Sequence, residues 1–396
     1  MIRLEMNGGI PRRVLLMMSV VGGLSVANLY YNQPLLEEMK AELGVGEVEA
    51  NLITVITQIG YACGLLFVVP MADMCSRRKI VSVSMGVAVL MALAIALSGG
   101  ISMVWVASWV LGVCSVIPQI FIPMAGQFSR PEHKSRNMGF VLSGLLTGVL
   151  GARVVSGYLG GWLGWRVMFA VASAVMFGCL AVSLRMLPVM QPTFKGSYGG
   201  LMKTVARIFT HHPKIRLYSL RASFSFGSMM AIWSCLAFHL AEAPFHAGSE
   251  QVGMLGLCGM AGAAAASGVG KYVPRFGIFR ISVLGTFLQL VAWAVALMWG
   301  DSYAGLVVAI VLVDVGAQCQ QLSNQSGCLQ EVPEASSRAN TIFMTSLFLG
   351  GSVGTFCAGM MWNRSEWLGV CGVGFAFAIA SLLVSVYECW RTNGKE

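Results

Sequence analysis

Apolar and polar segments alternate along this chain at the length scale of membrane spans. Stretches close to the ~20 apolar residues that a bilayer core requires occur twelve times. The third and sixth are short, and prolines interrupt the fourth. They begin near Val14, Ala50, Ile80, Met103, Gly139, Val167, Leu217, Val252, Ile278, Tyr303, Thr341 and Leu368. The pattern predicts an all-α integral membrane protein with 12 transmembrane helices.

Composition supports the same fold class. Of the 396 residues, 56% are hydrophobic and 11% are charged, and the mean hydropathy is +0.73. That leaves too little polar side chain to cover a water-soluble surface of this size. The 47 glycines favour close helix packing, on which association within a bilayer depends. We expect a tightly packed helical bundle.

The basic residues predict how the chain is oriented. Most of the 26 Lys and Arg fall in alternate connections between spans, and Lys40, Arg166 and Arg364 lie in the others. By the positive-inside rule, both termini are then cytoplasmic. The net charge of +9 follows from this arrangement, so it does not indicate nucleic acid. The first apolar stretch is longer than a signal-peptide core, and we interpret it as a retained span.

The longest connection divides six spans from six. Its prolines and glycines give three predicted parts: an N-terminal six-helix bundle over 1–187, a cytoplasmic linker over 188–214, and a C-terminal six-helix bundle over 215–396. Within the linker, 201–209 is basic and amphipathic. A helix on the inner membrane surface and a solvated linker are both consistent with it.

The two halves are also related in sequence. At an offset of 202, several residues of the first half recur in the second. The matches are Gln119 with Gln321, Pro131 with Pro333, Glu132 with Glu334, Ser135 with Ser337, Arg136 with Arg338, Gly148 with Gly350, Gly157 with Gly359, and Trp165 with Trp367. We predict two pseudo-symmetric bundles with a substrate site near the midplane between them.

Asp314 is the one acidic residue placed deep inside an apolar span. It begins a row with Gln318, Gln321 and Gln325, spaced so that all four share one helix face. Such a face is expected to line a cavity. Burial disfavours the charged form of a carboxyl group, which makes Asp314 a candidate site for an exchangeable proton. A structural acid satisfied by neighbouring groups is the alternative. The equivalent position in the first half is Gly112.

Two arginines also lie within spans. Arg153 is about 16 residues into the fifth span, roughly 24 Å from its inner end at the helical rise per residue. A charge at the centre of a membrane helix costs about 2.5 to 3.5 kcal/mol, so Arg153 is predicted to pair with Asp314 or to bind substrate or proton separately. Reaching toward the outer surface is the alternative. Arg221 is a further cavity candidate, or it reaches back to inner headgroups.

Other polar residues in apolar spans complete the predicted cavity. Amide and aromatic groups with few fixed charges suit a neutral, zwitterionic or amphiphilic organic solute. For each residue taken singly, a helix-packing role is equally consistent. The predicted substrate cavity comprises Asn28, Tyr31, Asn32, Thr54, Gln58, Gln119, Arg221, Gln318, Gln321 and Gln325.

The segment that follows the second span, GYACGLLFVVPMADMCSRRK, carries a recognisable motif. Asp73, Arg77 and Arg78 fill the acidic and basic positions of the loop G-x-x-x-D-R-x-G-R-R/K, and the chain here resembles the major facilitator superfamily. The second half holds a degenerate copy, GKYVPRFGIFR. The resemblance implies a charge latch at the cytoplasmic gate. Ordinary positive-inside charge is the alternative. The gate residues are Asp73, Arg77, Arg78, Arg136, Arg275 and Arg338.

Further segments extend the resemblance over the whole chain, closest to the bacterial drug/proton-antiporter-like group. They include ANLYYNQPLL, GLLTGVLGARVVSGYLGGWLGWRVMF and SRANTIFMTSLFLGG. The resemblance implies proton-coupled export of a small organic compound by alternating access, in the bacterial inner membrane. Uptake of a nutrient such as a sugar or organic acid is the alternative, and a non-transporting membrane sensor is a more distant one.

Nothing in the sequence predicts catalysis or a bound cofactor. The eleven cysteines form no CxxC pair, and the five histidines have no metal-ligand spacing. GVGK at 268–271 lacks the rest of a phosphate-binding loop. We therefore expect no enzyme activity, no metal and no cofactor. The expected partners are a small-molecule substrate, protons and membrane lipid, with the protein acting as a monomer.

Overall fold

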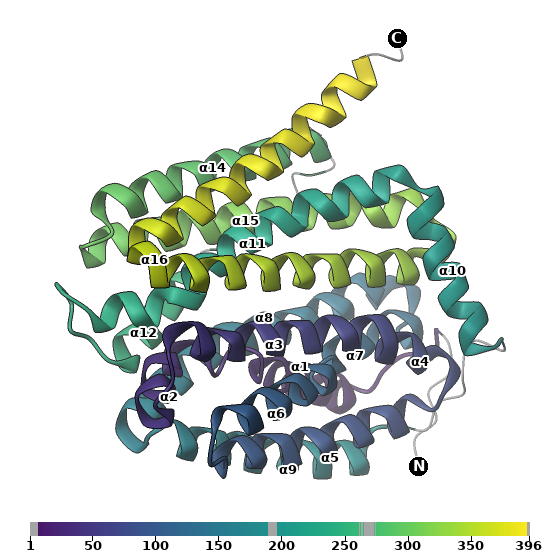
Figure 1. Ribbon diagram of the computed structural model, residues 1–396. Helices are drawn as coiled ribbons and strands as arrows, with labels where there is room; N and C mark the ends of the chain where they lie inside the picture. Colours follow the sequence, from purple (N-terminus) through teal and green to yellow (C-terminus); the bar gives the residue numbers. More distant parts are fainter. Residues whose placement is uncertain are drawn as a thin grey trace.

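The computed structural model is helical almost throughout (Figure 1). It describes residues 7–188, 196–260, 262, 264, 273 and 275–393, without the side chains of Asp73 and 391–393. The first nine helices are α1 (Arg12–Ala27), α2 (Leu36–Leu43), α3 (Glu47–Cys63), α4 (Val69–Met74), α5 (Arg77–Ala96), α6 (Ile101–Cys114), α7 (Ile117–Phe128), α8 (Lys134–Leu163) and α9 (Trp165–Met186). The rest are α10 (Tyr198–His211), α11 (Pro213–Ala241), α12 (Ser249–Leu255), α14 (Ile278–Trp299), α15 (Tyr303–Glu331) and α16 (Ser336–Asn393). Short 3-10 or π turns join some of them, including η1 (Gln33–Leu35), the π turn η2 (Gly64–Val68) and η4 (Gly256–Cys258).

Within the described part of the chain, nine helical segments are long and apolar enough to cross a membrane. One of them, α16, contains two helices, because Ser365 and Glu366 leave helical geometry in its middle. Helix α1 has 16 residues and is a shorter apolar helix. The predicted eighth span begins at α12 and continues into residues outside the described part. The all-helical membrane fold is confirmed, and the exact count of twelve stays a prediction.

The helices form two groups (Figure 1). Helix α1 packs on α8, α3 on α6, and α5 on α9 in the first group, while α11 packs on α16 and α14 on α15 in the second. Small residues bring these helices close together: a Cβ added at Gly148 would lie 2.1 Å from the carbonyl oxygen of Gly23. The domain boundaries expected from the sequence, at 187 and 214, stay a prediction.

The sequence repeat is visible in the backbone as well. Gly164, between α8 and α9, has φ of 83°, and Glu366, which lies 202 positions later within α16, has φ of 47°. Both residues therefore occupy the left-handed region at the turn between the last two spans of a half. A positive φ therefore occurs at the equivalent junction of each half, which supports the predicted pseudo-symmetry.

One end of the molecule, here called the α2 end, joins the two groups tightly. Ser249 Oγ of α12 lies 2.5 Å from Glu38 Oε1 of α2 and 3.0 Å from the carbonyl oxygen of Gly157 in α8. Asn51 Nδ2 of α3 donates to the carbonyl oxygen of Thr355 in α16 at 3.1 Å. Helices from both groups therefore meet closely at this end.

The opposite end, here called the α10 end, gathers the segments predicted to be cytoplasmic. Asn7 N donates to the carbonyl oxygen of Gln127 at 3.2 Å, and Tyr198 Oη donates to that of Phe67 at 3.0 Å. Helix α10 buries Leu201, Val205 and Ile208 and contacts α4, α11 and α16. The linker is thus partly helical and packs against the protein with its apolar face.

Candidate functional site

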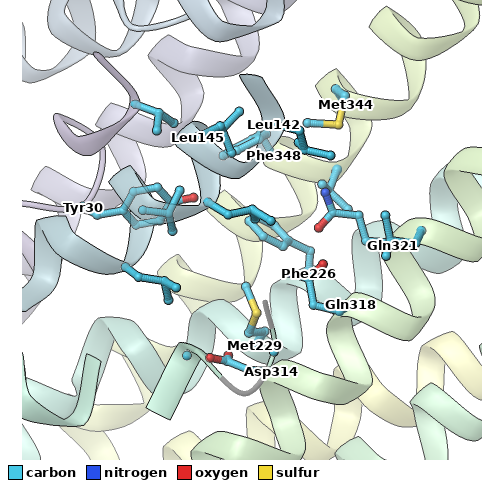
Figure 2. A pocket seen from close by; sticks show the side chains of 18 of the residues that line it. Tyr30, Leu142, Leu145, Phe226, Met229, Asp314, Gln318, Gln321, Met344 and Phe348 are labelled. Atoms are coloured by element: carbon cyan, nitrogen blue, oxygen red, sulfur yellow. The ribbon is translucent and has the colours of Figure 1, made fainter. Parts of the chain in front are cut away.

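A cavity of about 240 Å³ lies between the two groups of helices (Figure 2). Its walls come from α1 and the turn after it, α3, α7 and α8 in the first group, and from α11, α15 and α16 in the second. Asn340 and Met344 line it near the start of α16, and Gln325 near the end of α15, so it extends toward the α10 end. The cavity lies where the sequence repeat predicts a substrate site.

The predicted polar face of α15 lines this cavity. Asp314, Gln318, Gln321 and Gln325 all contribute to its wall, and Figure 2 shows the first three on one helix face. Gln119 lines the wall from the first group, opposite its repeat partner Gln321. Its Nε2 donates to Tyr61 Oη at 3.4 Å. The geometry expected for this helix face is confirmed.

Asp314 is 7% exposed and is held by a tryptophan. Trp233 Nε1 of α11 donates to Asp314 Oδ1 at 3.0 Å. Asp314 Oδ2 accepts no hydrogen bond from any residue that the structure describes. Gly259 leaves room beside that oxygen, because a Cβ there would lie 3.2 Å from Oδ2. One carboxylate oxygen is therefore fixed while the other has bonding capacity left.

Arg153 is 3% exposed and lies over the ring face of Trp233. Its guanidinium carbon is 4.1 Å from the centroid of the Trp233 ring and 4.8 Å from that of Tyr30. Its Nε donates to Gln33 Oε1 at 2.8 Å. Among the described residues no ion pair within 4.0 Å joins it to Asp314. The two charges are near enough to interact electrostatically, but a direct ion pair, one of the two arrangements that the sequence left open, is absent.

Two further titratable groups lie within electrostatic range of Asp314. They are Tyr30, which follows α1, and Cys258 of η4. The guanidinium of Arg153, the phenol of Tyr30 and the thiol of Cys258 thus surround the Asp314 carboxyl group at distances where their charges interact. A proton or an organic ion that reaches Asp314 meets this group of residues.

Several residues predicted for the cavity lie elsewhere. Asn28, Asn32, Thr54 and Gln58 are buried but do not line it. Asn28 Nδ2 donates to the carbonyl oxygen of Ser25 at 3.1 Å, and Gln58 Nε2 to Thr355 Oγ1 at 3.4 Å. Tyr31 lines a separate groove between α1, α8 and α9. None of the five side chains lines the cavity between the two groups, and a substrate contact for them stays a prediction.

Arg221 is fully buried outside the cavity. Its Nε donates to Asn324 Oδ1 at 2.8 Å, and its Nη1 pairs with Glu388 of α16. Arg221 does not line the cavity for which the sequence predicted it, and the groups it binds are protein side chains. The arginine instead belongs to a polar network inside the second group.

The predicted gate residues are spread over the α10 end. Arg77 Nε donates to the carbonyl oxygen of Ala72 at 3.2 Å, and Arg78 donates to that of Leu184. Arg136 and Arg275 are exposed, and Arg338 is half-buried. The side chain of Asp73 lies outside the described residues, so the latch proposed for it stays a prediction.

The sequence did not single out Phe226, Trp233 and Phe348, which form aromatic walls of the cavity. Tyr61, Phe226 and Phe348 pack at steep angles to one another. The ring centroids are 4.5 Å apart for Tyr61 and Phe348 and 5.2 Å apart for Phe226 and Phe348. Trp233 joins the two charged residues. Aromatic residues in an apolar span give no periodic signal that separates a cavity wall from a lipid contact.

Comparisons with known proteins agree with this architecture. The model of the Major Facilitator Superfamily matches residues 18–355. An uncharacterized transporter of Escherichia coli O157:H7, YgaY, is 32% identical over 379 residues and covers 96% of each chain. A probable transporter of Streptomyces coelicolor is 29% identical over 377 residues, or 94% of this chain and 87% of the relative.

Solved structures share the fold at low identity. A bacterial homologue of the human lysosomal transporter Spinster, in an inward-facing and occupied conformation, has a TM-score of 0.77 at 13% identity, covering 96% of this chain and 97% of the other. The peptide transporter POT in complex with sulfate has a TM-score of 0.76 at 17% identity, covering 94% and 93%. With the family match over most of its length, the chain belongs to the Major Facilitator Superfamily of multi-pass membrane transporters and is a transport protein, not an enzyme.

Proposed function

We propose that this protein is a proton-coupled secondary active transporter that exports a small organic compound from the bacterial cytoplasm. The observation that carries the proposal is Asp314, a nearly buried acid in the wall of the cavity between the two groups of helices. A carboxylate inside a membrane span is costly, and such residues mark proton or substrate pathways. No counterpart of Asp314 exists in the first half, where Gly112 occupies the equivalent position.

Alternating access supplies the mechanism. The α10 end carries most of the basic connections, so the positive-inside rule makes it the cytoplasmic end. The cavity then extends toward the cytoplasm while Ser249, Glu38 and Gly157 close the opposite end. This is the arrangement of an inward-open state. Breaking those contacts and closing the α10 end would expose the same cavity to the other side.

Protons can supply the work for this cycle. Each charge that crosses the membrane yields about 2.3 kcal/mol per 100 mV. Proton binding at Asp314 and substrate binding in the same cavity influence each other because the cavity is small and both species meet the same residues. We propose export because the sequence resembles the drug/proton-antiporter-like group.

The test uses purified protein in liposomes that contain a pH-sensitive dye. With a pH gradient imposed, a panel of organic solutes is added and proton movement is followed. We expect at least one solute to release protons across the membrane in a protein-dependent manner. A panel that covers amines, organic acids, sugars and zwitterions without any such release would contradict proton-coupled transport. Comparing solute accumulation in wild-type and deletion cells separates export from uptake.

A further inference from the structure

Two opposite charges lie side by side in the cavity without neutralising each other directly. Asp314 and Arg153 each contact Trp233, the first through its indole N–H and the second across its ring face. They are nearly buried, and in the described structure no ion pair within 4.0 Å links them. Buried charges are normally paired at close range, so this arrangement leaves room for a third component.

Both side chains are fixed and both have bonding capacity left. Arg153 Nε donates to Gln33, while the two terminal nitrogens of Arg153 donate to no residue in the described part of the chain. Trp233 holds Asp314 through Oδ1, which leaves Oδ2 available. The segment 256–259 packs against both side chains, since a Cβ at Gly256 would lie 2.9 Å from Arg153 Cβ and one at Gly259 would lie 3.2 Å from Asp314 Oδ2. Donors and an acceptor therefore line the same cavity.

The chemistry of these two side chains selects among ligands. A simple organic cation would satisfy Asp314 but would be repelled by Arg153, and a simple anion would meet the reverse situation. A ligand that carries both charges a short distance apart satisfies both groups at once. Beyond these two groups, Phe226, Met229 and Phe348 provide an apolar and aromatic lining, which suits an uncharged hydrophobic side chain.

We propose that the substrate is a small amphipathic zwitterion of the amino-acid type, whose carboxylate binds the terminal nitrogens of Arg153 and whose ammonium binds Asp314 Oδ2. Its apolar side chain occupies the aromatic part of the cavity. This inference rests on the proposed function, for which it names the substrate class. It also predicts how proton binding affects substrate binding. A proton on Asp314 neutralises the carboxylate that binds the ammonium group, so proton and substrate compete for the site, as antiport requires.

Binding to wild-type protein in lipid nanodiscs at neutral pH provides the test. One set of probes is L-phenylalanine, 2-phenylethylamine and 3-phenylpropionate, which share one side chain and differ in charge. A second set is L-leucine, 3-methylbutylamine and 4-methylpentanoate. Hydrogen bonds to charged groups contribute enough that in at least one set the zwitterion should bind about tenfold or more tightly than either singly charged analogue. An amine or an acid that binds as tightly as the zwitterion in both sets would overturn the proposal.

Variants assign each charge to its partner. Arg153→Gln should remove the advantage of phenylalanine over 2-phenylethylamine, and Asp314→Asn should remove its advantage over 3-phenylpropionate. The matched controls Arg364→Gln and Asp301→Asn change exposed residues away from the cavity and should keep both advantages. The binding of the probes to wild-type protein tests the proposal without any variant, so a variant that fails to fold does not prevent the test.

Transport measurements separate this inference from the proposed function. If an amine or acid drives Asp314-dependent proton movement while no zwitterion binds preferentially, the substrate class is wrong and the transporter mechanism stands. If zwitterions bind preferentially but neither they nor any other solute moves protons, the ligand class stands and the proton-coupled function is wrong.

Discussion

Arg153 and Arg221 are both arginines inside apolar spans, yet the structure gives them different surroundings. Arg153 lines the cavity between two aromatic rings. Arg221 is enclosed within the second group, where it pairs with Glu388 and Asn324. A buried arginine with its own carboxylate and amide partners contributes to stability, whereas one with free donors in a cavity is available to a ligand.

Arg221→Met therefore tests a structural role. Removing the guanidinium breaks the ion pair with Glu388 and leaves the buried Asn324 Oδ1 without its donor, so the free energy of unfolding in detergent should fall by about 3 kcal/mol. The exposed Arg207 of α10 offers a control, since Arg207→Met should change stability by less than about 0.5 kcal/mol. Equal stability of the two variants would show that Arg221 does not hold the second group together.

At the residue scale the sequence predicted helix faces better than partners. The face that contains Asp314, Gln318, Gln321 and Gln325 was predictable because one helix fixes its own periodicity. The partners of Asn32 and Gln58 were not, because contacts between helices decide whether a polar side chain faces a cavity or a neighbouring helix. Trp233 could not be singled out for the same reason: its role depends on two residues from α8 and α15.

Among the elements, α2 and α12 form the contact that closes one end of the cavity. Ser249 Oγ lies within hydrogen-bond distance of both Glu38 and Gly157, but a hydroxyl has one hydrogen and cannot donate to both at once. A protonated Glu38 can donate to Ser249 Oγ and leave the serine hydrogen for the Gly157 carbonyl. Burial raises the pKa of Glu38, with a smaller contribution from Glu42, although the Ser249 hydrogen bond lowers it.

Closure at the α2 end should therefore depend on pH. A carboxyl group with a raised pKa in the closed state binds protons more tightly there, so closure is favoured below the ordinary pKa of Glu38 and weakens as pH rises through the raised value. Spin labels at Ala41 of α2 and Met254 of α12, both exposed, would report the distance. In Glu38→Gln, whose amide can donate to Ser249, the short distance should persist at all pH values. A pH response identical to that of the wild type would contradict this role.

The spans themselves were predictable from length and apolar content, because the bilayer sets both. The break in the fourth predicted span appears as the boundary between α6 and α7, next to Pro118. The sequence did not predict that α10 packs against the protein. An amphipathic helix shows that it has an apolar face, but it does not show whether lipid or protein covers that face.

The whole molecule consists of two related groups of helices that meet most closely at one end. Gly157 of α8 contacts Gly253 of α12, and Gly359 of α16 contacts Asn51 of α3. These are equivalent positions, since Gly157 and Gly359, and Asn51 and Gly253, are each 202 residues apart. Two equivalent helix crossings, α8 with α12 and α16 with α3, thus close the α2 end. Two-fold related contacts of this kind can separate together in a single rigid-body movement.

The orientation of the molecule can be tested by labelling. In a variant in which the exposed Cys75 and Cys389 are replaced by serine, a cysteine at Ala206 of α10 should react with an impermeant maleimide only in inside-out vesicles. A cysteine at Ala41 of α2 should react only in right-side-out vesicles. The positive-inside rule requires this result, and the reverse pattern would mean that the cavity opens away from the cytoplasm.

Proton coupling through Asp314 is the central claim, and Asp314→Asn tests it most directly. Wild type, Asp314→Asn and the control Asp301→Asn are reconstituted at equal abundance, and solute-dependent proton movement is measured under an imposed pH gradient. Asparagine keeps the size of the side chain and cannot release a proton, so coupled movement should be lost in Asp314→Asn and retained in Asp301→Asn. Proton movement at the wild-type rate in folded Asp314→Asn would contradict the mechanism.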